Sequence, residues 1–313
     1  MSRFTLLGML AAMGGTFGAT SVHATFSIVA CDEQTQSCGV AVATHNLAVG
    51  NSVPFAEAGV GAGVSQFETN PQHGPHILDA LRSGANAEAA LETAMKQDNA
   101  FDDGAGLDFR QIGVVSIDGS SAAYSGSEAS PCSGFIAQGG VTVQGNGLAS
   151  ASVLRAMLLQ FTASDEPLAE RLLGALEAGY AEGGQTIGVT SAALYVATPE
   201  GWPVDVDLRV DFAPATAIDE LRVMHDASVA RTLLFRARRH LARDEKGRAA
   251  KMLDRALILA PDWDRIWLGA ARLSAEMNDS KDASARYRRF AELNPTWAEM
   301  LDNEIKSAQQ IQE

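Results

Sequence analysis

The larger, N-terminal part of the chain alternates between two patterns of apolar residues. In the first segments small and branched residues alternate and glycine is frequent, which is typical of closely packed β-strands. A hairpin is predicted around Asp118-Gly119. The predicted strand segments are TFSIVA (25–30), GVAVAT (39–44), SVPFAEAGVGAGVSQ (52–66, one or two strands), RQIGVVSIDG (110–119), SAAYSGS (121–127), a strand ending near VTVQGN (141–146), TSAALYVAT (190–198) and VDLRVDF (206–212).

Apolar residues recur at helical spacing in two further stretches. From Pro75 to Gln97 they predict two helices, which the turn SGANAEAA divides. Two more helices are predicted at about Ser150–Phe161 and Pro167–Gly179. Strands, a helical pair, strands, a second helical pair and closing strands predict an α+β fold in which helical layers enclose two sheets.

The C-terminal part is helical and contains an internal repeat. ALILAPDW (256–263) and FAELNPTW (290–297) resemble each other, and four identical residue pairs are separated by 34 positions: Ala249/Ala283, Leu259/Leu293, Pro261/Pro295 and Trp263/Trp297. That period predicts tetratricopeptide repeats, and a plain helical hairpin is the alternative. An array of fewer than three full repeats is marginally stable by itself. We therefore expect it to pack on the first domain, a protein partner or a second subunit.

The first 24 residues have the pattern of a secretory signal. Arg3 is followed by the apolar run Phe4–Met13 and then by Val22-His23-Ala24, an acceptable cleavage site. The predicted domains are therefore a signal peptide (1–24), a first domain (25–221) and a helical domain (222–313). No later run is long enough to span a membrane, so we expect a periplasmic or secreted protein.

Charge is distributed unevenly between the two domains. Residues 25–220 include 24 acidic and 6 basic residues, whereas the chain as a whole has a net charge of -14. This acidic first domain argues against a nucleic-acid partner.

Cleavage after Ala24 would make Thr25 the first residue of the mature protein. A terminal threonine combines a nucleophilic hydroxyl with a base, because its own α-amine, with a pKa of about 8, can take the hydroxyl proton. The pattern TFSIVA runs directly from this residue into a strand. We therefore expect Thr25 to be an N-terminal nucleophile, although many exported chains begin with a small residue by accident.

Cys31 and Cys38 flank the turn DEQTQS between the first two predicted strands. A hairpin would place them opposite each other, near disulfide distance, and an oxidising compartment would favour the bond. Two unpaired thiols are the alternative, and Cys132 is left over in either case.

Several of these segments together resemble a known family. The segments, in order between Thr25 and about Leu221, are TFSIVA, GVAVAT, LAVG, VPFAEAGVGAGVSQ, NPQHGP, RQIGVV, VQGN, SAAL and DLRVD. The region is similar to the family called domain of unknown function 1028. The resemblance implies a four-layer αββα sandwich like that of the N-terminal nucleophile (Ntn) hydrolases, with the mature N-terminus in the central cleft. The chain departs from the pattern at 187–190 and 129–135, which predicts another substrate or lost activity.

Three amide side chains at strand ends are candidates for the site. Asn146 is our choice for the oxyanion donor of an acyl transfer, and a turn residue is the alternative. Gln66 and Asn70 follow an apolar strand, where they would bind a substrate amide or else cap a turn.

The remaining candidates carry charge or titrate. His45 follows a strand and would tune the amine or bind an anionic substrate. Asp207 and Arg209 share one strand face, as substrate ligands or as a surface ion pair. His73 and His76 lack a carboxylate at a defined spacing, so we expect no metal site.

The sequence thus favours an exported amidohydrolase that uses Thr25 on a small amide or peptide and needs no cofactor. The alternative is a non-catalytic ligand-binding or scaffold protein of the cell envelope that retains the fold.

Overall fold

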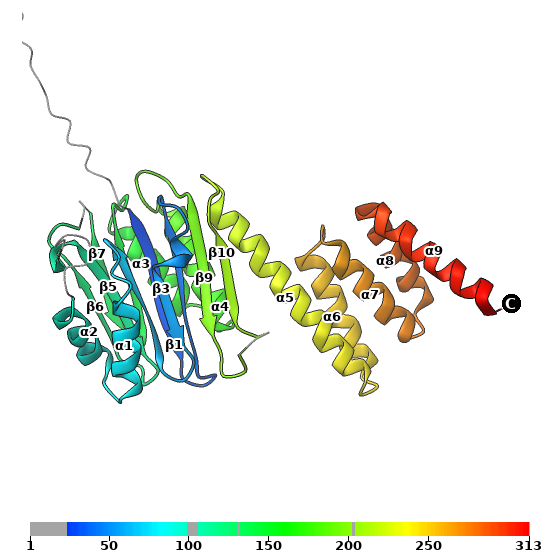
Figure 1. Ribbon diagram of the computed structural model, residues 1–313, viewed down its shortest axis with the longest axis horizontal. Coiled ribbons are helices and arrows are strands. Elements are labelled where there is room, and N and C mark those ends of the chain that lie inside the picture. Colours follow the sequence, from blue (N-terminus) through cyan, green and yellow to red (C-terminus); the bar gives the residue numbers. More distant parts are fainter. Residues whose placement is uncertain (1–23, 99–105, 130–131, 202–203, 313) are drawn as a thin grey trace, which may run out of the picture.

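The computed structural model describes residues 24–98, 106–129, 132–201 and 204–312 (Figure 1). The predicted signal peptide lies outside these residues, except for Ala24. One sheet has six antiparallel strands in the order β10-β9-β2-β1-β8-β7. Its strands are β1 (Thr25–Asp32), β2 (Ser37–Thr44), β7 (Gly134–Gln138), β8 (Val141–Asn146), β9 (Ser191–Ala197) and β10 (Val206–Val210).

The second sheet has four antiparallel strands in the order β3-β4-β5-β6. They are β3 (Pro54–Glu57), β4 (Gly61–Phe67), β5 (Arg110–Ser116) and β6 (Ser121–Ser125). The turn at Asp118-Gly119 joins β5 and β6, as predicted. Two short 3-10 turns, η1 (Val49–Asn51) and η2 (Leu107–Phe109), precede β3 and β5.

Successive side chains of each strand point to opposite faces of its sheet, and this alternation produces four layers. Phe26 and Ile28 of β1 pack in one apolar cluster with α3 (Ser152–Thr162) and α4 (Leu168–Ala181), whereas Val29 packs against the four-stranded sheet. Ile112 and Val114 of β5 pack against α1 (His73–Arg82) and α2 (Ala87–Lys96). The order is therefore helices, sheet, sheet, helices, and the predicted α+β class with two sheets is confirmed.

The C-terminal helices form the second part of the molecule. They are α5 (Ala217–Leu241), α6 (Lys246–Leu259), α7 (Asp264–Glu276), α8 (Ser280–Leu293) and α9 (Pro295–Gln312). Figure 1 shows α5 running from the sheets into this helical tail, where it packs with α6. The boundary predicted after residue 221 therefore falls inside a continuous helix.

Arg222, in the first half of α5, ties that helix to the sandwich. Its guanidinium donates to both carboxylate oxygens of Glu177 at 2.7 and 2.8 Å and to both of Glu170 at 2.8 and 2.9 Å, and both carboxylates belong to α4. Within the described residues, none of the helices combines the length and the apolarity that crossing a membrane requires.

Candidate functional site

Thr25 is the first residue of β1 and lies between the two sheets. Its neighbours across the six-stranded sheet are Thr44 on β2 and Asn146 on β8. Its backbone nitrogen donates to Oδ1 of Asn146 at 3.2 Å, and its Oγ1 lies 3.0 Å from Oγ1 of Thr44. Only 4 % of Thr25 is exposed. Strand pairing on both sides therefore fixes the nitrogen and the hydroxyl of this residue in a polar environment.

Gln111 on β5 fixes the orientation of the Asn146 side chain. Nε2 of Gln111 donates to the carbonyl oxygens of Gly145 at 2.9 Å and Gly134 at 3.3 Å, and such oxygens can only accept. Oε1 of Gln111 must then face Nδ2 of Asn146, which is 2.9 Å away. Oδ1 of Asn146 is left to face the nitrogen of Thr25, which needs an acceptor. The contacts with Gln111 and with Thr25 therefore require the same orientation of the Asn146 amide.

In this orientation the Asn146 side chain has a partner on each side. One N–H of its amide group donates to Gln111, and its oxygen faces the nitrogen of Thr25. An amide nitrogen carries two N–H groups, so the oxyanion role expected for Asn146 stays a prediction.

The polar contacts continue from Gln111 across the space between the sheets. Gln66 on β4 donates from Nε2 to Oε1 of Gln111 at 2.7 Å and accepts from Oγ of Ser27 at 2.7 Å. Gln144 on β8 donates to the same Ser27 hydroxyl at 2.7 Å. A Cβ at Gly113 would lie 2.3 Å from Oε1 of Gln144, so any other residue there would displace this amide. Gln66 thus belongs to the network that begins at Thr25.

Four residues of this network were not expected from the sequence: Thr44, Gln111, Gln144 and Ser27. Each is a buried polar residue on the strand face that points to the other sheet. The available signal was a glutamine inside an otherwise apolar strand, as in RQIGVV and VTVQGN. Such a glutamine is expected to have a partner, because burying an unpaired amide costs free energy.

His45 contacts the start of β1 through its backbone. Its nitrogen donates to the carbonyl oxygen of Ala24 at 3.4 Å, and Oγ1 of Thr44 donates to the same oxygen at 2.7 Å. The imidazole of His45, which we expected at the site, is on an exposed residue. The contact that the structure shows is therefore made by the N–H group of His45.

Asp207 and Arg209 lie apart from Thr25, on the edge strand β10, with β9 and β2 between them and β1. Together with Tyr195 they line a cavity of about 330 Å³. Nε of Arg209 is buried and has no hydrogen-bond partner in the part of the chain that the structure describes. Burial, with the charges of Asp205 and Asp207, raises the pKa of Tyr195. These residues form a second polar site at the edge of the sheet.

Asn70 belongs to a third cluster, on the helical side of the four-stranded sheet. Its side chain donates to Asp98, which also binds Nε of Arg110 at 3.1 Å and lies 3.5 Å from Nε2 of His73. Nδ1 of His73 is 3.0 Å from Oγ of Ser65 on β4. Burial is the main cause that lowers the pKa of His73 to about 4. Asn70 and Gln66 are close in sequence but lie in different layers.

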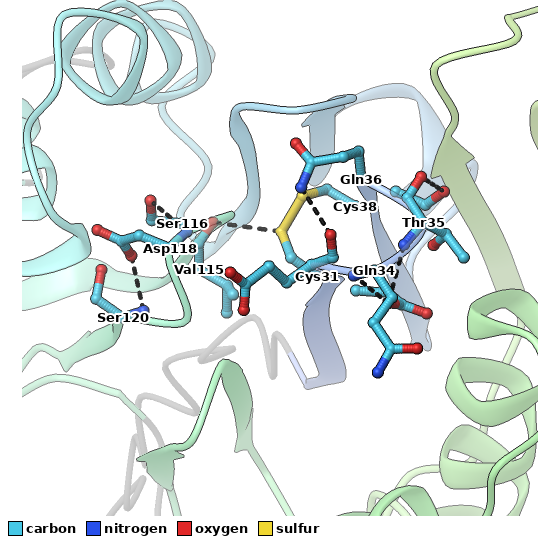
Figure 2. The surroundings of a disulfide bond; sticks show 12 residues. Cys31, Gln34, Thr35, Gln36, Cys38, Val115, Ser116, Asp118 and Ser120 are labelled. Carbon is cyan, nitrogen blue, oxygen red and sulfur yellow. Dashed lines mark hydrogen bonds between the residues drawn. A yellow bond between two sulfur atoms is a disulfide. The ribbon is translucent and has the colours of Figure 1, made fainter.

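Cys31 and Cys38 are joined by a disulfide bond between β1 and β2, where they face each other in register (Figure 2). Their Cα atoms are 4.1 Å apart. Sγ of Cys31 lies 3.8 Å from the carbonyl oxygen of Val115 on β5, so the bond contacts the second sheet. Cys132 is a free, exposed thiol. The bond holds the far end of the strand that begins at Thr25.

One group of side chains among the described residues has metal-like spacing, and it contains neither His76 nor His73. It comprises Glu170, His225 and Asp226. The guanidinium of Arg222 donates to Glu170 and lies 3.5 Å from Asp226. A cation therefore already pairs with both carboxylates, and burial lowers the pKa of His225. The cluster is therefore an ion-pair junction between α4 and α5.

The fold and this polar network define an α+β protein of two stacked antiparallel sheets, with its candidate site at the start of the central strand β1. The chain belongs to the family of unknown function DUF1028, whose family model matches residues 25–221. It is also similar to a solved structure, protein SPO2555 from Silicibacter pomeroyi, with 33% sequence identity and a TM-score of 0.57. The match covers 64% of this chain and 88% of that one. No curated protein matched the chain.

Proposed function

We propose that the protein is an exported amidohydrolase of the Ntn type, in which Thr25, freed by cleavage after Ala24, attacks a small amide or peptide. The observation that carries this proposal is the position of Thr25 between the sheets, with its nitrogen and its hydroxyl each held by a strand partner. Most chain ends fray, whereas this one would be fixed. Two sheets between helical layers, the architecture expected of an Ntn hydrolase, also support it.

The chemistry needs only the groups of Thr25 and a donor for the oxyanion. Oγ1 of Thr25 attacks the carbonyl carbon while the α-amine takes the hydroxyl proton. The C–N bond of the tetrahedral intermediate then breaks, and the leaving nitrogen takes the proton from the amine. Water, activated by the same amine, hydrolyses the acyl ester. Asn146 orients the amine, and Gln111 orients Asn146. This reaction uses no cofactor.

The test begins with the first residue of the exported protein. Edman degradation and intact-mass measurement should find Thr25 at the start. A panel of acyl-trapping electrophiles should then add one acyl group on Thr25. Thr25→Ala should abolish the adduct, and the matched variant Thr25→Ser, which keeps a hydroxyl beside the amine, should retain it. A terminus at any other residue, or no adduct across the panel, would contradict the proposal.

A ligand-binding protein without catalysis is the second candidate, and the cavity beside β10 favours it. The buried Nε of Arg209 has an unused N–H, and Asp207 and Tyr195 add polar groups to the same walls. A small ligand with an acceptor group would fit this chemistry. Loss of small-molecule binding in Arg209→Met, with no adduct on Thr25 in the wild type, would favour this candidate.

Export and the helical tail complete the proposal. A disulfide between Cys31 and Cys38 is typical of an oxidising compartment, which supports a periplasmic or secreted protein. The helices of the tail carry the 34-residue repeat, and Trp263 and Trp297, which are equivalent in the repeat, each pack in an apolar cluster. We propose a tetratricopeptide-like array that docks a protein partner or a second subunit. Deleting 245–313 should then abolish co-purification of that partner.

A further inference from the structure

The carbonyl oxygen of Ala24, the residue before Thr25, accepts hydrogen bonds from two donors. They are Oγ1 of Thr44, at 2.7 Å, and the backbone nitrogen of His45, at 3.4 Å. A hydroxyl has one proton, and that of Thr44 goes to this oxygen. The hydroxyl of Thr25 must therefore be the donor in its 3.0 Å contact with Thr44. The uncleaved chain thus fills both donors with its own carbonyl.

Cleavage after Ala24 removes this acceptor and leaves the donors in place. Thr44 is the last residue of β2 and is buried, and it remains paired in register with Thr25. Asn46 donates its backbone N–H to Oγ1 of Thr44 at 3.3 Å, which helps to hold the hydroxyl. A buried donor without an acceptor is unfavourable, so the vacated place has an affinity for a new carbonyl oxygen.

We propose that the Thr44 hydroxyl and the His45 backbone N–H bind the carbonyl oxygen of the substrate and stabilise the oxyanion that forms on it. This inference rests on the proposed role of Thr25 as nucleophile. The donor Oγ1 of Thr44 is adjacent to the atom that forms the new bond, whereas Asn146 presents its acceptor oxygen to the nitrogen of Thr25. When Oγ1 of Thr25 bonds to the carbonyl carbon, the C=O electron pair moves onto this oxygen, and collapse of the intermediate returns it.

The same arrangement implies that Ala24 blocks the site in the uncleaved chain. Ala24 places its carbonyl where the acyl group of the substrate would lie, so the uncleaved chain contains a substrate-like occupant. Cleavage then frees the amine of Thr25 and the two donors in one step.

The test measures acylation by an N-acylated β-lactone, which opens on the nucleophile and leaves an acyl ester that intact mass detects. Thr44→Val removes the hydroxyl from a side chain of similar shape, and the acylation rate should fall by about 10²-fold. Thr44→Ser keeps the hydroxyl and should stay within a few-fold of the wild type. Thr142→Val is the matched control, because this buried strand threonine has no hydrogen-bond partner within the described residues. Its rate should equal that of the wild type.

Periodate separates failure of this inference from failure of the proposed function. It cleaves the carbon–carbon bond of a 1,2-amino alcohol, so in unfolded samples it modifies any free N-terminal threonine. If the wild type and Thr44→Val both react with periodate and acylate at equal rates, the inference is overturned while Thr25 stays the nucleophile. If the wild type resists periodate, its terminus is not a free threonine, which contradicts the proposed function and with it this inference. If the wild type reacts with periodate but not with the lactone, the proposed function and this inference are both contradicted. If Thr44→Val does not fold, Thr44→Ala should show the same fall in rate.

Discussion

The backbone nitrogen of Thr25 and Oδ1 of Asn146 are 3.2 Å apart, although 121 positions separate the two residues in the sequence. Asn146 is in turn bound by Gln111 from the opposite sheet. The start of β1 is therefore fixed by both sheets, and the arrangement places an acceptor where the amine of a cleaved chain would lie.

Asn146→Ala should weaken acylation of Thr25 without removing the nucleophile. The amine loses its acceptor, and loss of orientation of this kind costs on the order of 10²-fold in rate. Oε1 of Gln111 still accepts from Gln66, so unfolding should become easier by only about 1 kcal/mol. Acylation kinetics and urea unfolding check the two effects. Acylation at the wild-type rate would show that Asn146 does not orient the amine.

Gln111→Glu should destabilise the fold more strongly. Glutamate cannot donate when ionised, so it would face the carbonyl oxygen of Gly145 in place of the present hydrogen bond. We expect a loss of about 2 kcal/mol at neutral pH. This environment raises the pKa of the new carboxyl group in the folded state, so its protonation should reduce the deficit as the pH falls. Urea unfolding of variant and wild type at pH 7.5 and 5 measures the difference, and a constant deficit would argue against this geometry.

Local patterns predicted most of the first domain because its elements differ in period. The apolar residues of 75–97 gave two helices, which the structure places at His73–Arg82 and Ala87–Lys96. The boundary after residue 221 was less accurate, because α5 serves both parts of the molecule. Ala217, Ile218 and Leu221 at its start pack in the core of the sandwich, whereas Ala230, Leu233 and Ala237 pack with residues of α6. A composition change marks where packing partners change and does not mark where a helix ends.

The candidate site was predicted less completely, because its contacts join distant strands. Thr25 could be found from the cleavage pattern alone. The predicted hairpin with Cys31 opposite Cys38 already implies that Thr44 lies opposite Thr25, but its register was not followed to that end. Gln111 acquires its role only when β5, in the other sheet, packs against the start of β1, and the sequence does not show this packing. Gln66 and Asn70 show the same limit, since a separation of four residues put them on opposite faces of the sheet.

Loss of the Cys31–Cys38 bond should lower stability modestly. The bond closes a short loop, with a sequence separation of 7, so the Cys31→Ala, Cys38→Ala double variant should lose about 2 kcal/mol. Thermal unfolding measures this loss. Iodoacetamide gives the control, because the native protein should take one adduct, on the exposed Cys132, and the reduced, unfolded protein three. Three adducts on the native protein would contradict the bond.

Lowering the pH should destabilise the protein, because the pKa of His73 is lower in the folded state than in the unfolded chain. Its pKa is about 4 in the folded state and 6.5 as the ordinary value. The unfolded chain therefore binds the proton more readily between these values, and stability is lost as the pH falls from 6.5 towards 4. Since one pKa unit corresponds to about 1.4 kcal/mol, the total loss is roughly 3 kcal/mol.

The measurement is urea unfolding at pH 7 and 4.5. His73→Gln should be less stable at pH 7, because the contact between Nδ1 of His73 and Oγ of Ser65 is lost, but it should show a smaller decrease on acidification. His76→Gln removes a partly exposed histidine of the same helix and should keep most of the wild-type decrease, because His76 is a lesser cause of the lowered pKa of His73 than burial. Equal decreases in wild type and His73→Gln would exclude this explanation.

Arg222 should determine how firmly α5 is attached to the sandwich. Lysine keeps the charge but cannot form the paired hydrogen bonds to Glu170 and Glu177, so Arg222→Lys should cost about 2 kcal/mol. The matched variant Arg289→Lys changes an exposed ion pair in the tail and should cost less than about 0.5 kcal/mol. Because the loss is at the junction of α4 and α5, it should also speed limited proteolysis within α5. Equal unfolding curves for the two variants would mean that apolar packing alone holds α5 in place.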